Sequence, residues 1–97
     1  MGLLRRVLDS LRRSLAPPLF VIEIRDGTAR TRDGHVPAGL VSGMADVARD
    51  LGLRGGTIYG IRRPQGTTLG FSADIPEEAH QRLRNVLATH RHRIPGA

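Results

Sequence analysis

The sequence contains no cysteine, and no apolar run approaches the roughly 20 residues that span a bilayer. The missing thiols exclude disulfides, thiolate nucleophiles and zinc sites that depend on sulfur. Arg12 and Arg13 interrupt what would be the apolar region of a secretory signal. At 97 residues, with 39% hydrophobic and 25% charged residues, the chain has the size and balance of one globular domain. We therefore expect a soluble, cytoplasmic, single-domain protein.

Lysine is also absent, so all 15 basic residues are arginines, whose guanidinium groups form forked contacts with carboxylates and phosphates. The net charge of +6 is unevenly distributed. Residues 1–18 contain four arginines and one aspartate, which gives 4 − 1 = +3, and residues 89–97 add +2. Residues 19–88 contain nine arginines and eight acidic residues, which leaves +1. The predicted folded body is therefore not a polycation, and the excess charge lies at the two ends.

The first segment has the spacing of an amphipathic helix that ends at Pro17 and Pro18. Four leucines share one helical stripe, and four arginines surround it. The stripe is Leu4, Leu8, Leu11 and Leu15, and the arginines are Arg5, Arg6, Arg12 and Arg13. This layout suits a helix on an anionic membrane surface, or one that packs on its own domain or on a second copy. We favour packing on protein, because the segment lacks the Trp or Phe common in interfacial helices, although the stiff Pro-Pro joint favours a projecting helix.

A β-hairpin and a helix are predicted next. Phe20, Ile22 and Ile24 have the period of a half-buried strand, and Asp26-Gly27 is typical of a two-residue hairpin turn. A strand of Thr28 to Arg32 returns. The expected pairs are Ile24 with Ala29, Ile22 with Thr31 and Glu23 with Arg30. Pro37 then opens a helix that Gly52 ends, with an apolar face of Leu40, Met44, Val47, Ala48 and Leu51.

A second hairpin follows, and its loop length decides which side chains are buried. A two-residue loop, Pro64-Gln65, would pair Ile58 with Phe71 and Gly60 with Leu69, which puts Tyr59 and Ile61 on the opposite face from Phe71 and Leu69. A three-residue loop that includes Gly66 pairs Tyr59 with Phe71 and Ile61 with Leu69, and so keeps these four large side chains on one face. We prefer the second register, which predicts a positive φ at Gly66. The outer face is then Ile58, Gly60, Arg62, Thr68, Gly70 and Ser72.

A last helix opens near Pro76 and buries Ala79, Leu83, Val86, Leu87 and His90. The predicted fold class is α+β: a two-layer sandwich with a four-stranded antiparallel sheet and two helices on one face, in the order ββαββα, preceded by an amphipathic helix. The predicted organisation is a leader helix over 1–18, the ββαββα domain over 19–90 and a flexible basic tail over 91–97. The expected core is Phe20, Ile22, Ile24, Met44, Val47, Leu51, Tyr59, Ile61, Leu69, Phe71, Leu83 and Val86.

Two stretches resemble a small bacterial family that is catalogued only as a domain of unknown function. They are GTIYGIRR at 56–63 and PEEAHQRLRNV at 76–86. The resemblance covers roughly residues 19–88 and leaves the leader outside. It implies a bacterial source, and no activity or functional residue comes with it.

Catalytic and metal-binding patterns are missing from the sequence. His80, His90 and His92 lack the spacing of three or four residues with which helical histidines share a metal. No strained nucleophile turn precedes Ser42 or Ser72, and no glycine-rich phosphate loop is present. We therefore predict no enzyme activity, no catalytic residue, no cofactor and no metal.

The function expected from the sequence is that of a small non-enzymatic binding or adaptor domain. Its contacts would be with an unknown protein partner or a second copy, through Gly60, Arg62 and Gly70 on the outer sheet face. The leader's four leucines and four arginines would serve assembly or peripheral contact with an anionic membrane. The alternative is nucleic-acid binding through arginines of the two hairpins. Against this alternative, all three aromatic residues are predicted to be buried, which leaves none to stack on bases.

Overall fold

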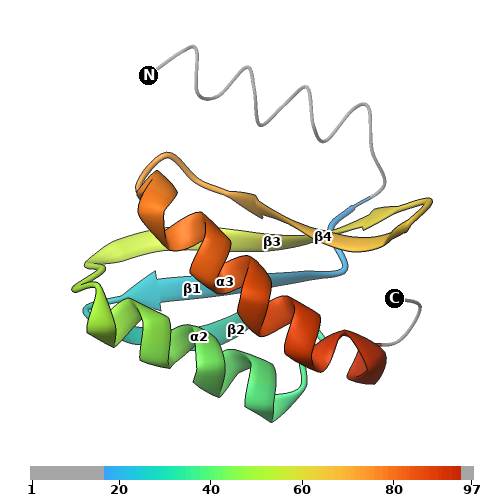
Figure 1. The fold of residues 1–97 in the computed structure, drawn as a ribbon, viewed down its shortest axis with the longest axis horizontal. Helices are drawn as coiled ribbons and strands as arrows, with labels where there is room; N and C mark the ends of the chain where they lie inside the picture. The colour runs from blue at the N-terminus through green and yellow to red at the C-terminus, as the bar shows by residue number, and fades with distance from the viewer. Residues whose placement is uncertain (1–16, 95–97) are drawn as a thin grey trace.

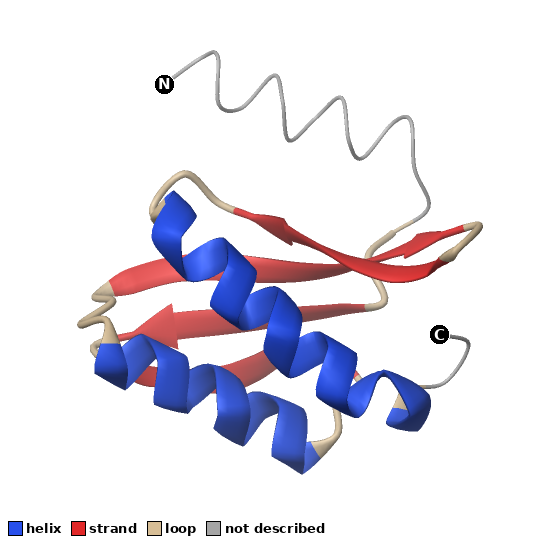
Figure 2. Cartoon of the chain, in the orientation of Figure 1, coloured by secondary structure: helices blue, strands red, loops and turns tan. Residues whose placement is uncertain are grey.

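The structure is a computed structural model, which describes residues 17–94. Four strands form one antiparallel sheet in the order β2-β1-β3-β4, and two α-helices cover the same face of it (Figures 1 and 2). The elements are β1 (Phe20–Arg25), β2 (Thr28–Gly34), α2 (Ala38–Asp50), β3 (Gly55–Arg63), β4 (Gly66–Phe71), α3 (Glu77–His90) and the 3₁₀ helix η1 (Arg91–Arg93). The predicted α+β fold in ββαββα order is therefore confirmed. The predicted leader helix lies outside the described residues.

The first hairpin has the predicted register. Ile22 pairs with Thr31, Glu23 with Arg30 and Ile24 with Ala29. Asp26 and Gly27 both have positive φ, at 47° and 74°, as a type I′ turn requires. The twist of such a turn matches that of the two strands it joins, and this agreement between turn and apolar alternation fixes the register.

The second hairpin has the register that we rejected from the sequence. Arg63 pairs with Gly66, so the loop is Pro64-Gln65 alone. Ile58, not Tyr59, lies opposite Phe71, and Gly60 lies opposite Leu69. Gly66 does have the predicted positive φ, at 121°, but in the shorter turn.

The ring of Phe20 explains this register. Phe20 is fully buried and pairs with Gly60 across the β1–β3 ladder. A Cβ atom at position 60 would overlap the Phe20 ring, so the residue that faces the core here must be glycine. Because successive side chains of a strand alternate between faces, a buried Gly60 places Tyr59 and Ile61 on the opposite face.

Replacing Gly60 with alanine should therefore destabilise the fold. Overpacking of this kind lowers the free energy of unfolding by about 1–3 kcal/mol. Urea unfolding of the full chain measures the change. Gly70→Ala is the matched control, because the nearest atom to a Cβ there is the flexible end of Ile61. Equal destabilisation by the two substitutions would contradict the assignment of Gly60 to the core.

The core lies between the sheet and the two helices. Seven of the twelve expected core residues are buried, namely Phe20, Ile22, Ile24, Met44, Val47, Leu69 and Leu83. Leu51, Phe71 and Val86 are half-buried against this core. Tyr59 and Ile61 are half-buried on the opposite face, so their assignment to the core was wrong. Ile58 takes their place and is fully buried.

The fold continues past His90, where a flexible tail was expected. Arg91–Arg93 form a turn of 3₁₀ helix, and Ile94 is buried in the core. The Arg91 guanidinium donates a hydrogen bond to the carbonyl oxygen of Thr67 on β4 at 3.2 Å. Residues 91–94 therefore belong to the folded domain, because they extend α3 and pack its C-terminal end against β4. Among residues 17–94, no helix has the length and apolar character needed to cross a membrane.

Candidate contact surface

The face of the sheet that points away from α2 and α3 is the candidate functional surface, and we call it the open face. Strand alternation and pairing place fifteen residues on it. They are Val21, Glu23 and Arg25 of β1, Thr28, Arg30, Arg32 and Asp33 of β2, Gly55, Thr57, Tyr59, Ile61 and Arg63 of β3, and Gly66, Thr68 and Gly70 of β4. An antiparallel sheet with one covered face and one open face is a common arrangement, so the open face must be judged by its side chains.

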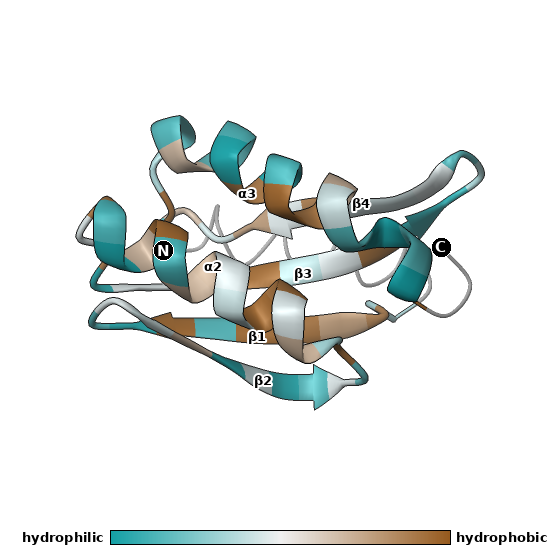
Figure 3. Cartoon of the chain, turned by 60° about the horizontal axis from the view of Figure 1, so that its bottom comes forward, coloured by the Kyte–Doolittle hydropathy of each residue, from teal (hydrophilic) through white to brown (hydrophobic). Residues whose placement is uncertain are grey.

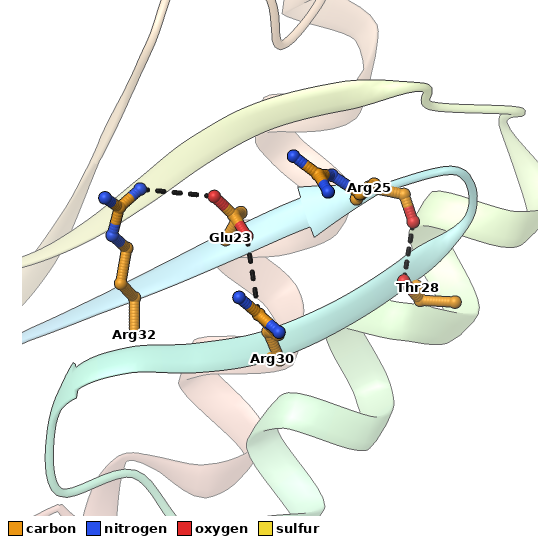
Figure 4. A network of polar contacts seen from close by, with 5 residues as sticks. All are labelled: Glu23, Arg25, Thr28, Arg30 and Arg32. Atoms are coloured by element: carbon orange, nitrogen blue, oxygen red, sulfur yellow. Dashed lines mark hydrogen bonds and ion pairs between the residues drawn. The ribbon is translucent and has the colours of Figure 1, made fainter.

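One half of the open face, over β1 and β2, is charged. Glu23 lies between two arginines, with carboxylate oxygens 3.4 Å from Arg30 Nε and 3.2 Å from Arg32 Nη1 (Figure 4). Arg25 lies nearby on the same strand, at the hairpin end (Figure 4). Two guanidinium groups therefore hold one carboxylate, and a third arginine follows it two positions along β1. We call Glu23, Arg25, Arg30 and Arg32 the guanidinium cluster.

Arg30 and Arg32 lie two residues apart in β2, so strand alternation places both on the face of Glu23, and both reach its carboxylate. A β-bulge follows: Ile22 pairs with Thr31 but Val21 pairs with Asp33, so Arg32 is an extra residue in β2 and Asp33 lies opposite Val21. The carboxylate is held, with a side-chain exposure of 20%, whereas the two arginine side chains are 79% and 65% exposed. The guanidinium groups thus remain available to a second anion.

The other half of the open face, over β1 and β3, is apolar. Val21 lies directly opposite Tyr59, and Ile61 follows two positions along β3. All three are half-buried, and none belongs to the core cluster found within residues 17–94. Gly70 lies opposite Tyr59 on β4, and the absence of a side chain there leaves room for the end of Ile61. We call Val21, Tyr59 and Ile61 the apolar patch.

The interaction residues expected from the sequence do not lie together on one described surface. Leu4, Leu8, Leu11, Leu15, Arg5, Arg6, Arg12 and Arg13 lie outside the described residues. Gly60 is buried under Phe20 and is not on the open face. Arg62 is exposed but alternates to the helix-covered face, whereas Gly70 is on the open face.

The apolar patch was not predicted, because it exists only in the register of the second hairpin that was rejected. The two-residue loop Pro64-Gln65 was the signal for the correct register, and with that register Tyr59 and Ile61 fall on the open face. Figure 3 shows the related contrast along the sheet: β2 is mostly hydrophilic, whereas β1 and β3 carry apolar stretches.

Two histidines and one serine of the described chain, His80, His90 and Ser72, have structural partners. His80 stacks on Phe71 with ring centroids 4.0 Å apart, and its Nε2 donates to the Ile75 carbonyl at 3.1 Å. His90 Nδ1 donates to the Val86 carbonyl at 3.0 Å. Ser72 Oγ accepts a hydrogen bond from the Thr57 amide at 2.9 Å. Within residues 17–94, no group of three His, Asp or Glu side chains is arranged to hold a metal ion.

Comparison with known proteins shows a family match over a longer part of the chain than the resemblance noted in the sequence. Residues 4–95 match the model of the family described as "Protein of unknown function (DUF3634)". The match includes most of the leader, which the resemblance over roughly 19–88 had left outside. No curated protein and no solved structure matches the chain. Because the match covers nearly its whole length, the chain belongs to this family, DUF3634, a domain of unknown function.

Proposed function

We propose that this protein is a small, non-enzymatic binding or adaptor domain that acts through protein–protein contact at its open face. The observation that carries the proposal is the position of the apolar patch, Val21, Tyr59 and Ile61. These side chains lie outside the core, beside a guanidinium cluster whose arginines remain exposed. A central apolar area with an aromatic residue and neighbouring arginines has the composition of a protein contact surface. In this proposal the domain acts in the cytoplasm or at the inner surface of a membrane.

The charge of the open face indicates the chemistry of the partner. Arg25, Arg30, Arg32 and Arg63 outnumber Glu23 and Asp33 on this face, so the partner surface should present carboxylates beside an apolar side chain. A symmetric contact between two copies would bring two guanidinium clusters together, because such a contact uses the same patch on both subunits. We therefore favour a different, acidic protein over self-association.

Photo-crosslinking tests this proposal in the protein's native host. A photoreactive benzoylphenylalanine at Tyr59 should form a covalent adduct with a distinct protein partner. The same group at Gln81, an exposed position on α3, is the control and should not form that adduct. Replacing Arg30 and Arg32 with glutamate should abolish the adduct at position 59, since the partner is acidic. A pattern of adducts that is the same from positions 59 and 81 would reject the open face as the contact surface.

Nucleic-acid binding is the second candidate, and one observation favours it. Tyr59 lies on the same face as the arginines, so an aromatic side chain is present there to stack on a base. A titration with single-stranded oligonucleotides decides between the two candidates. Micromolar affinity that falls steeply with salt and is lost in Tyr59→Ala supports this candidate. No detectable binding at low salt removes it.

A further inference from the structure

The apolar patch lies close to the point where the leader joins the sheet. The Leu19 amide donates a hydrogen bond to the Gly60 carbonyl at 2.7 Å, so the chain enters the sheet beside Tyr59 and Ile61. We infer that residues 1–15 fold back as a helix and dock their leucine stripe on the apolar patch. The leader thereby competes, within one molecule, with the partner of the open face. The competition rests on the proposed function, whereas the docking itself does not.

The lengths of the segments allow this docking. Residues 16–18 in extended form span about 10 Å, which is close to the spacing between packed layers. A helix of residues 1–15 is about 22 Å long, and strands of six to nine residues, such as β1 and β3, are about 20–30 Å long. A leader that starts one layer out from the sheet, at the end of this extended joint, therefore lies along the sheet without overhanging it.

The stripe and the patch match in chemistry. Leu4, Leu8, Leu11 and Leu15 offer an uninterrupted aliphatic row, and a lone helix with such a row needs a surface on which to bury it. On the open face, the apolar patch offers such a surface, and two small residues of β4, Thr68 and Gly70, border it. The family match, which starts at residue 4, places this stripe in the same family domain as the sheet.

Charge makes this docking reversible. The leader carries a net charge of 4 − 1 = +3, and the guanidinium cluster beside the patch is also positive. Docking of the leader therefore relies on apolar contact and is opposed by like charges, whereas an acidic partner gains attraction at the same place. An acidic partner should displace the leader from Tyr59.

Tyr59 itself reports on the docking, because the chain has one tyrosine and no tryptophan. Quenching of its fluorescence by acrylamide is compared in the full chain and in Leu8→Gln/Leu11→Gln. We expect the quenching constant to rise severalfold in this variant. The control Arg6→Gln/Arg13→Gln changes positions on the opposite side of the helix and removes charge that opposes docking, so it should not raise the constant. Equal constants in the wild-type chain and the leucine variant would overturn the inference.

A crosslink gives a second readout that does not depend on the stability of the leucine variant. The natural chain has no cysteine, so Leu11→Cys/Thr68→Cys introduces the only thiols. Oxidation should produce a disulfide within the monomer at all protein concentrations, and Arg13→Cys/Thr68→Cys should form it much more slowly. Crosslinked dimers in place of monomers would assign the stripe to a second copy and reject docking within one molecule. Tyr59 quenching that changes only when anionic vesicles are added would assign the stripe to a membrane and also reject it.

This test and the test of the proposed function fail independently. Tyr59 quenching is measured on the isolated protein, so a negative result leaves the open face as a partner site without an internal competitor. A negative photo-crosslinking result leaves leader docking intact as a purely structural contact.

Discussion

Leu83→Ala should lower the free energy of unfolding by about 2–5 kcal/mol. Leu83 is fully buried in the middle of α3, where it faces the sheet with Ala79 and Leu87. Truncation removes apolar contacts and leaves a cavity that the sheet and α2 fill only in part. Because small domains have unfolding free energies of about 5–15 kcal/mol, the loss is a large share of the total. Urea unfolding followed by circular dichroism measures it.

Gln81→Ala is the control for this substitution. Gln81 lies on the exposed side of the same helix, where its side-chain amide donates to Asn85 at 3.0 Å. Its replacement should change the free energy by about 0.5 kcal/mol or less. A Leu83→Ala effect of that same small size would mean that the buried face of α3 is assigned wrongly.

The elements of the fold were predictable where local signals agreed. In the first hairpin, the Asp26-Gly27 turn and the alternation of Phe20, Ile22 and Ile24 require the same register, and the structure has it. In both α-helices the apolar stripe identifies the buried side, with Met44 on α2 and Leu83 on α3 at its centre. Periodicity within one element is enough for such predictions, because each helix or strand has one face to bury.

The second hairpin shows where local signals fail. Its two registers differ in whether Tyr59 and Ile61 share a face with Leu69, and the larger apolar set favoured the wrong one. The deciding contact, Phe20 against Gly60, joins residues 40 positions apart and belongs to the ladder between β1 and β3. Maximising apolar burial within the second hairpin alone takes no account of Phe20, whose ring comes from the first hairpin and fills the space beside Gly60.

The candidate contact surface was only partly predictable for the same reason. Arg25, Arg30, Arg32, Arg62 and Arg63 were expected to converge on the two hairpins, and all of them except Arg62 lie on the open face. The apolar patch beside them appears only in the correct register. Ile94 shows a similar limit, since its burial depends on how the end of α3 meets β4.

Two matched substitutions on one strand test most directly whether the apolar patch is a surface outside the core. Ile58 and Ile61 are both isoleucines of β3, but Ile58 is fully buried and Ile61 is half-buried on the open face. Ile58→Glu places an unpaired charge in the core and should lower the free energy of unfolding by about 3–5 kcal/mol or more. Ile61→Glu should cost about 1 kcal/mol or less, because position 61 is outside the core and the new carboxylate reaches water once the leader is released from the open face.

Thermal and urea unfolding of the two full-length variants, followed side by side by circular dichroism, make the comparison. The predicted result is an unfolded or severely destabilised Ile58→Glu chain and an Ile61→Glu chain with a cooperative transition close to that of the wild type. An Ile61→Glu chain that is unfolded, beside an Ile58→Glu chain that is stable, would place Ile61 in the core and contradict the account.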